Sequence, residues 1–289
     1  MTVLEAIQRS TDFLTRKGVD SARLQAELLL AHVLQVKRMQ LYLNFERALT
    51  DQEIVPYREF IRRRGEREPL QHIVGSANFC GLELEVNRHV LVPRPETEIL
   101  AEKGWTFLNE IFAKAGKSPT ALDLATGSGC IAIALAWNCK AARLIATDIS
   151  AQALEAARKN IEAHKLADRV TLLQGNAFDA LQRDARFHLI VSNPPYIPSD
   201  EIETLQPEVR DFDPPIALDG GTDGLAFYRI IAARGLALLE PGGKCMVEFG
   251  DDQAPALKEI FEKENWIVDA TIEDYTHQPR VMIASATSQ

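Results

Sequence analysis

Asn193, Pro194, Pro195 and Tyr196 follow an apolar run and combine groups that suit chemistry on a planar nitrogen. The prolines have a fixed φ and no N–H, so their carbonyls remain as acceptors, and the Asn193 side-chain carbonyl adds another. An amide or amino NH2 group could donate one hydrogen to Asn193 and the other to the Pro194 carbonyl, with Tyr196 stacked on its flat face. Such acceptors favour a pyramidal nitrogen and direct its lone pair at a methyl carbon, which stabilises the transition state more than the planar ground state. Alone, the segment is also consistent with a simple turn after a strand.

A second group of residues has the pattern of a nucleotide-type site. The sequence Ala-Leu-Asp-Leu-Ala-Thr-Gly-Ser-Gly over 121–129 passes from an apolar run through small residues toward a helix. Gly127 and Gly129 allow backbone to approach a ligand closely. Asp148 ends the next apolar run, nineteen residues after Gly129, where a carboxylate can accept both hydrogen bonds of a ribose diol.

On its own, this second group leaves three interpretations open. The first is a site for an adenosine-containing methyl donor. The second is a site for a dinucleotide such as NAD, because Gly127-x-Gly129-x-x-Ala132 also satisfies the dinucleotide fingerprint. The third is a tight structural turn without a ligand. Asp123 is equally consistent with a carboxylate that satisfies amide groups of the loop. The Asn-Pro-Pro-Tyr segment, two apolar runs later, favours the methyl donor, because a dehydrogenase has no obvious use for it.

Composition and charge narrow the class of protein. No stretch of the 289 residues approaches the roughly 18 to 20 apolar residues of a membrane span. The four cysteines form no C-x-x-C pair, which favours neither a disulfide framework nor a zinc site. The N-terminus lacks the pattern of a secretory signal. We therefore expect a soluble, cytoplasmic protein without a metal.

The net charge of −9 is unevenly distributed. Residues 1–85 hold 12 basic and 12 acidic residues, so the whole deficit lies in residues 86–289. This acidity argues against direct binding to nucleic acid. The one exception is a run of five arginines between Arg58 and Arg67, but glutamates at 59, 66 and 68 interleave with it. That mixture predicts a solvated helix face rather than a polyanion site.

The periodicity predicts the elements that position these residues. Residues before about 72 read as amphipathic helices, and 72–86 as a hairpin with turns at Gly75 and Gly81. A helix is expected over 96–113. Beyond it, short apolar runs at 121–125, 144–147, 170–173, 189–192 and 246–249 alternate with helical stretches at 130–137, 150–166 and 225–239. Alternation of this kind predicts an α/β fold, with a mostly parallel sheet covered on both faces and a ligand site at the carboxyl ends of its strands.

These residues resemble those of class I S-adenosylmethionine-dependent methyltransferases of the HemK/PrmC type. The likeness spans nearly the whole chain. It is carried by the segments 92–98 (Val-Pro-Arg-Pro-Glu-Thr-Glu), 193–198, 208–218, 220–225 and 274–281. The resemblance implies a Rossmann-like domain with seven strands, the last antiparallel, and a small N-terminal helical domain joined to it by a β-hairpin. It gives the predicted boundaries 1–72 for the helical, substrate-docking domain, 73–91 for the hairpin linker and 92–289 for the methyltransferase domain.

The resemblance also implies the activity: methylation of the side-chain nitrogen N5 of the glutamine in the Gly-Gly-Gln motif of peptide chain release factors. For the cofactor, S-adenosyl-L-methionine, it implies that Ala125, Thr126, Gly127, Ser128 and Gly129 wrap the methionine part. Asp148 would hold the ribose, Asn176 and Ala177 would flank the adenine, and Asn193 would also contact the cofactor. The target glutamine would be gripped by Asn193, Pro194, Pro195 and Tyr196, of which Asn193, Pro194 and Tyr196 are the expected catalytic residues. A monomer is the expected state of an enzyme whose substrate is itself a protein.

The sequence departs from the family at two of these positions. Ala125 replaces the usual glycine, at a cost of about 1 kcal/mol if that residue needs a positive φ. Ala177 is smaller than the usual residue beside the adenine. Arg94, Glu96 and Glu98 are equally consistent with a structural ion-pair cluster and are given no catalytic role.

Two other functions remain as alternatives. One is an amino-methyltransferase that acts on adenine N6, cytosine N4 or guanine N2 in DNA or RNA, since a flipped base presents a similar NH2 group. The other is a non-catalytic nucleotide-binding protein. Asn193 and Tyr196 count against the second alternative, because binding alone does not need them.

Overall fold

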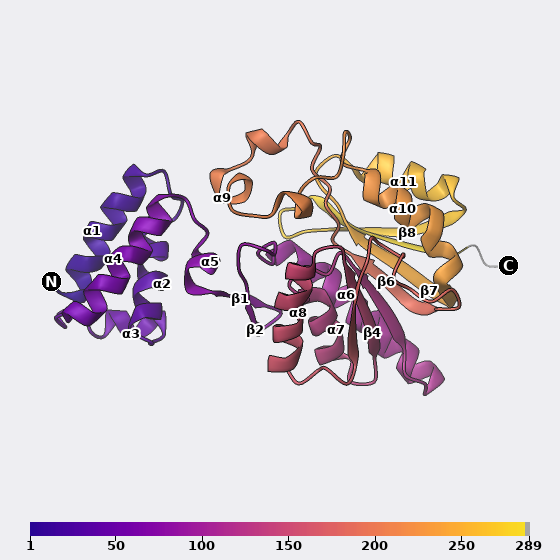
Figure 1. The fold of residues 1–289 in the computed structure, drawn as a ribbon, viewed down its shortest axis with the longest axis horizontal. Coiled ribbons are helices and arrows are strands. Elements are labelled where there is room, and N and C mark those ends of the chain that lie inside the picture. Colours follow the sequence, from indigo (N-terminus) through magenta and orange to yellow (C-terminus); the bar gives the residue numbers. More distant parts are fainter. Residues whose placement is uncertain (287–289) are drawn as a thin grey trace. The chain divides into compact units, whose positions relative to one another are not determined.

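The computed structural model describes residues 1–286, which divide into two units (Figure 1). The helical unit comprises Met1–Ser76 together with Gln206–Phe212, and the sheet unit comprises Ala77–Leu205 and the chain from Asp213 onward. Residues 206–212 thus belong to the helical unit although the segments on both sides of them belong to the sheet unit. Within residues 1–286, no helix is both long enough and apolar enough to cross a membrane.

The helical unit is a bundle with its own apolar core. Its helices are α1 (Val3–Arg16), α2 (Ala22–Val33), α3 (Arg38–Tyr42), α4 (Asp51–Gly65), α5 (Leu70–Val74) and α9 (Pro207–Arg210). Thr2 caps α1 by accepting from the Glu5 N–H at 3.2 Å, and Glu53 accepts from the Thr50 N–H at 2.9 Å where α4 begins. Fully buried Leu14, Leu29, Leu30, Leu41 and Tyr57 fill the interior.

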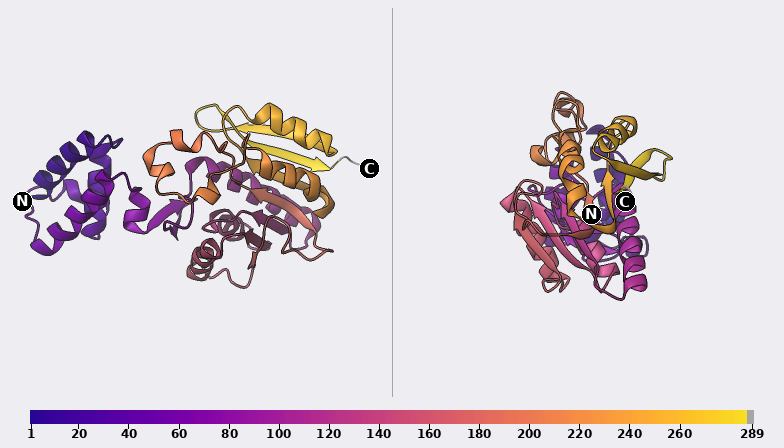
Figure 2. Two further views of the ribbon diagram at one scale, coloured as in Figure 1. Left: turned by 45° about the horizontal axis from the view of Figure 1, so that its top comes forward. Right: turned by 90° about the vertical axis from the view of Figure 1, so that its right-hand side faces the viewer.

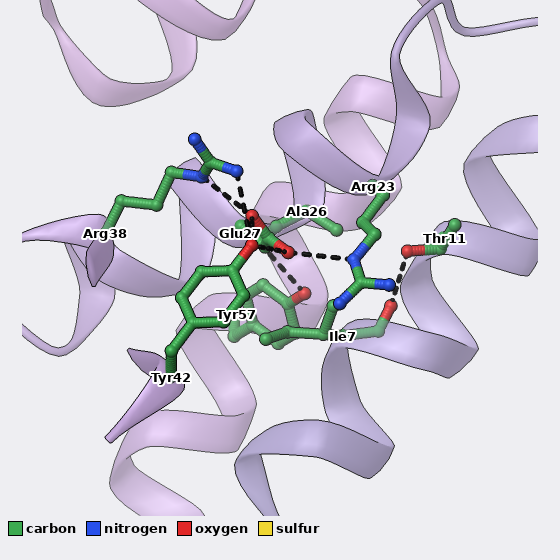
Figure 3. Close-up of polar contacts among 8 residues, drawn as sticks. All are labelled: Ile7, Thr11, Arg23, Ala26, Glu27, Arg38, Tyr42 and Tyr57. Atoms are coloured by element: carbon green, nitrogen blue, oxygen red, sulfur yellow. Dashed lines mark hydrogen bonds and ion pairs between the residues drawn. The ribbon is translucent and has the colours of Figure 1, made fainter. Parts of the chain in front are cut away.

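A buried carboxylate ties three of these helical residues together (Figure 3). Glu27 of α2 is fully buried and accepts from Arg23 Nε at 2.9 Å, Arg38 Nε at 2.7 Å and the Tyr42 hydroxyl at 2.9 Å. Burial would raise the pKa of Glu27, but these hydrogen bonds outweigh it and lower the pKa. The network therefore fixes α3 against α2 without leaving a buried charge unpaired.

The arginines between 58 and 67 are mostly paired with carboxylates. Arg62 pairs with Glu59 and Glu66, Arg63 with Glu68, and both Arg64 and Arg67 with Glu208. The predicted solvated face is confirmed at Arg62, whose side chain is more than half exposed. It is wrong at Arg64, which is only 5% exposed because Glu208, far along the chain, neutralises it.

A hairpin of β1 (Ser76–Phe79) and β2 (Leu82–Glu85) follows α5. Cys80 and Gly81 both have positive φ, 51° and 77°, which matches the tight turn that suits the twist of hairpin strands. The predicted strand at residues 72–74 is wrong. Those residues end the short helix α5, which Gly75 terminates with a φ of 80°.

The sheet unit contains a seven-stranded sheet. Its strands are β3 (Thr120–Leu124), β4 (Arg143–Asp148), β5 (Val170–Gln174), β6 (Phe187–Ser192), β7 (Leu239–Glu248), β8 (Trp266–Glu273) and β9 (Pro279–Ala286). Their order is β5-β4-β3-β6-β7-β9-β8, and β9 runs antiparallel to both of its neighbours while the other pairings are parallel. The predicted α/β fold with an antiparallel last strand is confirmed.

Helices cover both faces of this sheet (Figure 2). They are α6 (Pro95–Ala115), α7 (Cys130–Asn138), α8 (Ala151–Ala163), α10 (Ala226–Gly235) and α11 (Ala254–Lys263), with short 3-10 turns at Ile202–Thr204, Pro215–Ala217 and Leu236–Leu238. Successive residues of a strand point to opposite faces. Leu189 and Val191 of β6 accordingly pack in the core with α6 and α7, and Ile190 packs in the core with α10 and α11.

The order of the strands indicates where on the sheet a ligand would bind. The chain leaves β3 toward β4 on one side of it, whereas β6 pairs with β3 on the other side. The carboxyl ends of β3, β4, β5 and β6 are therefore at one edge, around the point where the order reverses. In open parallel sheets, ligands bind at this position.

Candidate functional site

One cavity at this edge brings most of the predicted site residues together. It measures about 1130 Å3 including its open mouth. Its lining includes Ala125, Thr126, Gly127, Ser128, Asp148, Asn176, Ala177, Asn193 and Pro195. Gly129, Pro194 and Tyr196 are not among the residues that line it within the described part of the chain. Most residues predicted for the cofactor thus share one cavity with Asn193 and Pro195, whereas Pro194 and Tyr196, also predicted for the target nitrogen, do not line it.

The loop after β3 is shaped by three residues with positive φ. Ala125, Gly127 and Gly129 have φ values of 55°, 56° and 81°. A Cβ added at Gly127 would meet no atom within 4 Å, whereas one at Gly129 would lie 3.2 Å from the Ala157 Cβ. Gly127 therefore leaves room on the cavity side, and Gly129 allows α7 to pack closely against α8. Ala125 holds the conformation of a glycine, which costs about 1 kcal/mol.

Asp148 connects this loop to the end of β4. Its Oδ2 accepts from the Gly127 N–H and its Oδ1 from the Ser150 N–H, each at 2.9 Å. Burial raises the pKa of Asp148, and these backbone donors oppose the rise. Each carboxylate oxygen has a further lone pair, so the aligned side chain can accept from a diol in the cavity.

Asp123 lies beneath the same loop and is fully buried. Its Oδ2 accepts from the Thr126 hydroxyl at 2.6 Å and from the Ala132 N–H at 3.1 Å. Burial raises the pKa of Asp123 to about 7. From the sequence, Asp123 is interpreted as a carboxylate that satisfies amide groups of the loop. In the structure its donors are a hydroxyl of the loop and an amide of α7, so Asp123 joins the loop to α7.

The loop after β5 is tied to β4. The Gly175 N–H donates to the Asp148 carbonyl at 3.0 Å, and the Thr147 hydroxyl donates to the Ala177 carbonyl at 3.2 Å. Ala177 has a φ of 48° and is 5% exposed. Asn176 and Ala177 thereby border the cavity on a loop that the neighbouring strand holds in place.

Asn193 follows β6 directly and is oriented by a hydrogen bond. Its Nδ2 donates to Thr97 Oγ1 at 3.0 Å, which leaves the side-chain carbonyl for a ligand. The Tyr196 carbonyl accepts from Gln253 Nε2 at 2.8 Å, and burial raises the pKa of the Tyr196 hydroxyl to about 12. Tyr196 stays a neutral phenol at ordinary pH.

Sequence reasoning gave no role to several residues of the cavity, among them Arg94, Thr97, Ile216 and Phe227. Arg94 Nη2 donates to Asp213 Oδ2 at 2.6 Å, and burial raises the pKa of Asp213 to about 6. Glu98 Oε1 accepts from the Cys80 N–H at 2.8 Å. Arg94 and Glu98 therefore make structural contacts. Of the four cavity residues without a predicted role, Arg94, Thr97 and Ile216 lie in segments that carry the family resemblance, and Phe227 does not.

Comparison with known proteins identifies the family. Residues 5–75 match the family described as the PrmC N-terminal domain, and residues 101–208 match the methyltransferase small domain. A release factor glutamine methyltransferase of Geobacter sulfurreducens is 41% identical over 281 residues, which cover 97% of this chain and 95% of that protein. The chain belongs to the release factor glutamine methyltransferase family. A second member, from Chlorobaculum tepidum, is 42% identical over 90% of this chain and 89% of its own.

A solved structure supports the fold assignment independently. A methyltransferase from Pyrococcus furiosus matches with a TM-score of 0.53 and 23% identity, covering 71% of this chain and 89% of that one. At this level of identity the likeness concerns the fold. The predicted class I methyltransferase fold of this family member is thus confirmed.

Proposed function

We propose that the protein transfers a methyl group from S-adenosyl-L-methionine to the side-chain nitrogen N5 of the glutamine in the Gly-Gly-Gln motif of peptide chain release factors. Two relatives are named release factor glutamine methyltransferases. The observation that carries the proposal is the orientation of Asn193. Its NH2 group is held by Thr97, so its carbonyl is available in the cavity as an acceptor for an amide NH2. We expect the reaction to take place in the cytoplasm.

The residues of the cavity fit the cofactor. S-adenosyl-L-methionine supplies an electrophilic methyl group. Residues 125–128 would hold its methionine part, where Gly127 leaves room for close approach. Asp148 would accept from the ribose hydroxyls, and Asn176 and Ala177 would flank the adenine. Gly129 does not line the cavity; as the N-cap of α7, it would connect the cofactor-binding loop to that helix.

The remaining residues act on the target amide. Its nitrogen is a poor nucleophile because the lone pair is delocalised into the carbonyl. Acceptors at Asn193 Oδ1 and the Pro194 carbonyl hold both hydrogens of the NH2 group and favour the pyramidal nitrogen of the transition state. They also fix the direction of the lone pair. The methylated nitrogen loses its proton readily, so this step needs no side-chain base.

The three predicted segments of the chain are assigned different roles. We infer that residues 1–72 help to dock the release factor, that 73–91 link the two parts and that 92–289 perform the transfer. The balanced charge of residues 1–85 and the acidity of the rest support a protein partner over a phosphate backbone. A monomer is sufficient for this scheme.

A methyl-transfer assay with three acceptors tests the proposal. S-adenosylmethionine labelled in its methyl group is incubated with the enzyme and a release factor, its Gly-Gly-Ala variant, or duplex DNA. We expect label in the intact release factor alone, loss of it with Asn193→Ala, and no loss with Asn109→Ala, an exposed asparagine on α6. Label in DNA would establish the base-methyltransferase alternative. Tighter binding of NAD than of S-adenosylmethionine would overturn the assigned cofactor.

A further inference from the structure

Gln253 makes two hydrogen bonds that join the loop after β6 to the loop after β7. Its Nε2 donates to the Tyr196 carbonyl at 2.8 Å, and its Oε1 accepts from the Gly250 N–H at 2.9 Å. A side-chain amide has an NH2 donor at one end and a carbonyl acceptor at the other. Here each end faces a backbone group of the opposite kind, so the two partners fix the orientation of the Gln253 amide.

The backbone of Gln253 is held as well. Gln253 is the N-cap of α11, and its carbonyl accepts from the Leu257 N–H at 2.9 Å. Its side chain is partly buried. The bridge therefore starts from a fixed point, so it can hold the Tyr196 carbonyl in place rather than follow its movement.

The bridge has room because two of its neighbours are buried glycines. A Cβ added at Gly224 would overlap the Tyr196 carbonyl oxygen and lie 2.6 Å from Gln253 Nε2. One added at Gly250 would lie 3.0 Å from Tyr196 Cδ2 and 3.3 Å from Gln253 Oε1. Gly224 also lies in the segment 220–225, which carries part of the family resemblance, and this packing accounts for a glycine there.

The segment from Asn193 to Tyr196 needs anchors at its two ends. Its two central residues are prolines, which have no N–H and so cannot donate a backbone hydrogen bond. At the first end, Asn193 Nδ2 donates to Thr97 Oγ1 at 3.0 Å. At the second end, the Tyr196 carbonyl is held by Gln253. The position of the Pro194 carbonyl, which lies between these ends, therefore depends on both anchors.

We propose that Gln253 is a positioning residue: by fixing the Tyr196 carbonyl, it holds the Pro194 carbonyl where the target NH2 group is bound. The inference rests on the proposed function, in which this carbonyl and Asn193 Oδ1 bind the two hydrogens of the target amide. Without the bridge, the chain stays attached at the next residue, whose N–H donates to the Leu218 carbonyl at 3.0 Å. Loss of the bridge is therefore expected to slow methyl transfer and to leave the fold and cofactor binding intact.

Two substitutions at position 253 test the inference, with Gln182→Glu at an exposed position as the control. Gln253→Met keeps the length of the side chain but removes both polar groups. Gln253→Glu keeps an acceptor but can donate to the Tyr196 carbonyl only when its carboxyl group is protonated. We measure kcat and KM for the release factor from about pH 5.5 to about pH 8.5, above the ordinary pKa of a glutamate, and the Kd for S-adenosylmethionine by titration. Each kcat is divided by the wild-type value at the same pH, which cancels the titration of neighbours such as Asp251, the partner of Arg280.

The two variants are expected to differ in their pH dependence. Gln253→Met should lower kcat by about 10- to 100-fold, as for a misplaced catalytic group, with KM and the cofactor Kd within about threefold of wild type. For Gln253→Glu, the ratio to wild type should be highest at the acidic end and fall as the pH rises, because a carboxylate presents only lone pairs to the Tyr196 carbonyl. The ratios for Gln253→Met and Gln182→Glu should not change with pH. A side chain that merely filled space would give no such difference.

Two results would contradict the positioning role. One is a Gln253→Met enzyme with kcat within about twofold of wild type. The other is a Gln253→Glu ratio that stays constant across the pH range. If Gln253→Met does not bind S-adenosylmethionine, the pH dependence of Gln253→Glu decides alone. A wild-type enzyme that leaves the release factor unlabelled would instead refute the proposed function and, with it, the inference.

Discussion

Arg64 of α4 donates to Glu208 of α9 at 2.9 Å, across 144 positions of the sequence. Arg67 binds the same carboxylate through Nε at 2.7 Å and Nη2 at 2.6 Å. One carboxylate therefore pairs with two arginines and anchors residues 206–212 in the helical unit.

Replacing Glu208 by glutamine should destabilise the helical unit. The variant keeps the shape of the side chain but leaves the buried Arg64 guanidinium without its ionic partner, at a cost of about 1–3 kcal/mol. Urea unfolding followed by the helical circular-dichroism signal should show a lower midpoint for Glu208→Gln. Glu203→Gln, an exposed glutamate in the same connection, serves as the control and should unfold like wild type. Equal midpoints for the two variants would show that the pairing contributes nothing.

Replacing Asp148 by alanine should weaken cofactor binding. The variant removes the acceptor expected for the ribose and the anchor of the Gly127 N–H. Loss of charged hydrogen bonds of this kind costs about 1.5–3 kcal/mol, so calorimetric titration should give a Kd for S-adenosylmethionine raised about 10- to 100-fold. The exposed Asp184→Ala should bind normally. An unchanged Kd for Asp148→Ala would contradict the assigned role.

Replacing Ala125 by glycine should stabilise the protein or leave it unchanged, although the same change elsewhere usually destabilises. The φ of 55° at Ala125 is strained for alanine by about 1 kcal/mol, and relief of this strain offsets the entropy that glycine adds to the unfolded chain. The matched control is Ala163→Gly, at an exposed position in α8, which should lower stability by about 0.5–1 kcal/mol. Thermal melts of the two variants should therefore separate. Equal losses in both would show that Ala125 is not strained.

The stabilising effect of Glu248→Gln should grow as the pH rises. The folded pKa of Glu248, about 7, lies above its ordinary value of 4.5. The contribution of this group to stability is thus fully present below about pH 4.5 and is lost as the pH rises through 7. A neutral glutamine avoids that loss, so its melting temperature relative to wild type should be higher at pH 8 than at pH 5. The exposed Glu264→Gln should show no such trend, and a constant difference for Glu248→Gln would contradict the raised pKa.

The sequence predicted the strands that carry the site but not every element of the sheet. The apolar runs before Ala125, Asp148 and Asn193 are short and bounded by polar or small residues, which is why their ends could be located. Strands β8 and β9 were implied only by the family resemblance. After Trp266, exposed and partly buried residues alternate along β8. Polar residues therefore interrupt the strand, and no continuous apolar run marks it.

Hydrogen-bond partners far apart in sequence could not be predicted. Thr97 and Asn193 are hydrogen-bonded, yet they belong to segments that only the folded chain brings together, and no spacing in the sequence relates them. At Gly129 the sequence predicted the local pattern but not the contact that explains it. Its place in a glycine pattern was visible, but its contact with Ala157 depends on how α7 packs against α8.

The position of the transferred methyl group decides whether the enzyme modifies the glutamine of the Gly-Gly-Gln motif. A release factor is treated with the enzyme and S-adenosylmethionine, digested, and its Gly-Gly-Gln peptide sequenced by tandem mass spectrometry. We expect a single methyl group on the side-chain nitrogen of that glutamine, absent when the enzyme carries Asn193→Ala and present with Asn109→Ala. A methyl group on any other residue, or an unmodified glutamine with the active wild-type enzyme, would contradict it.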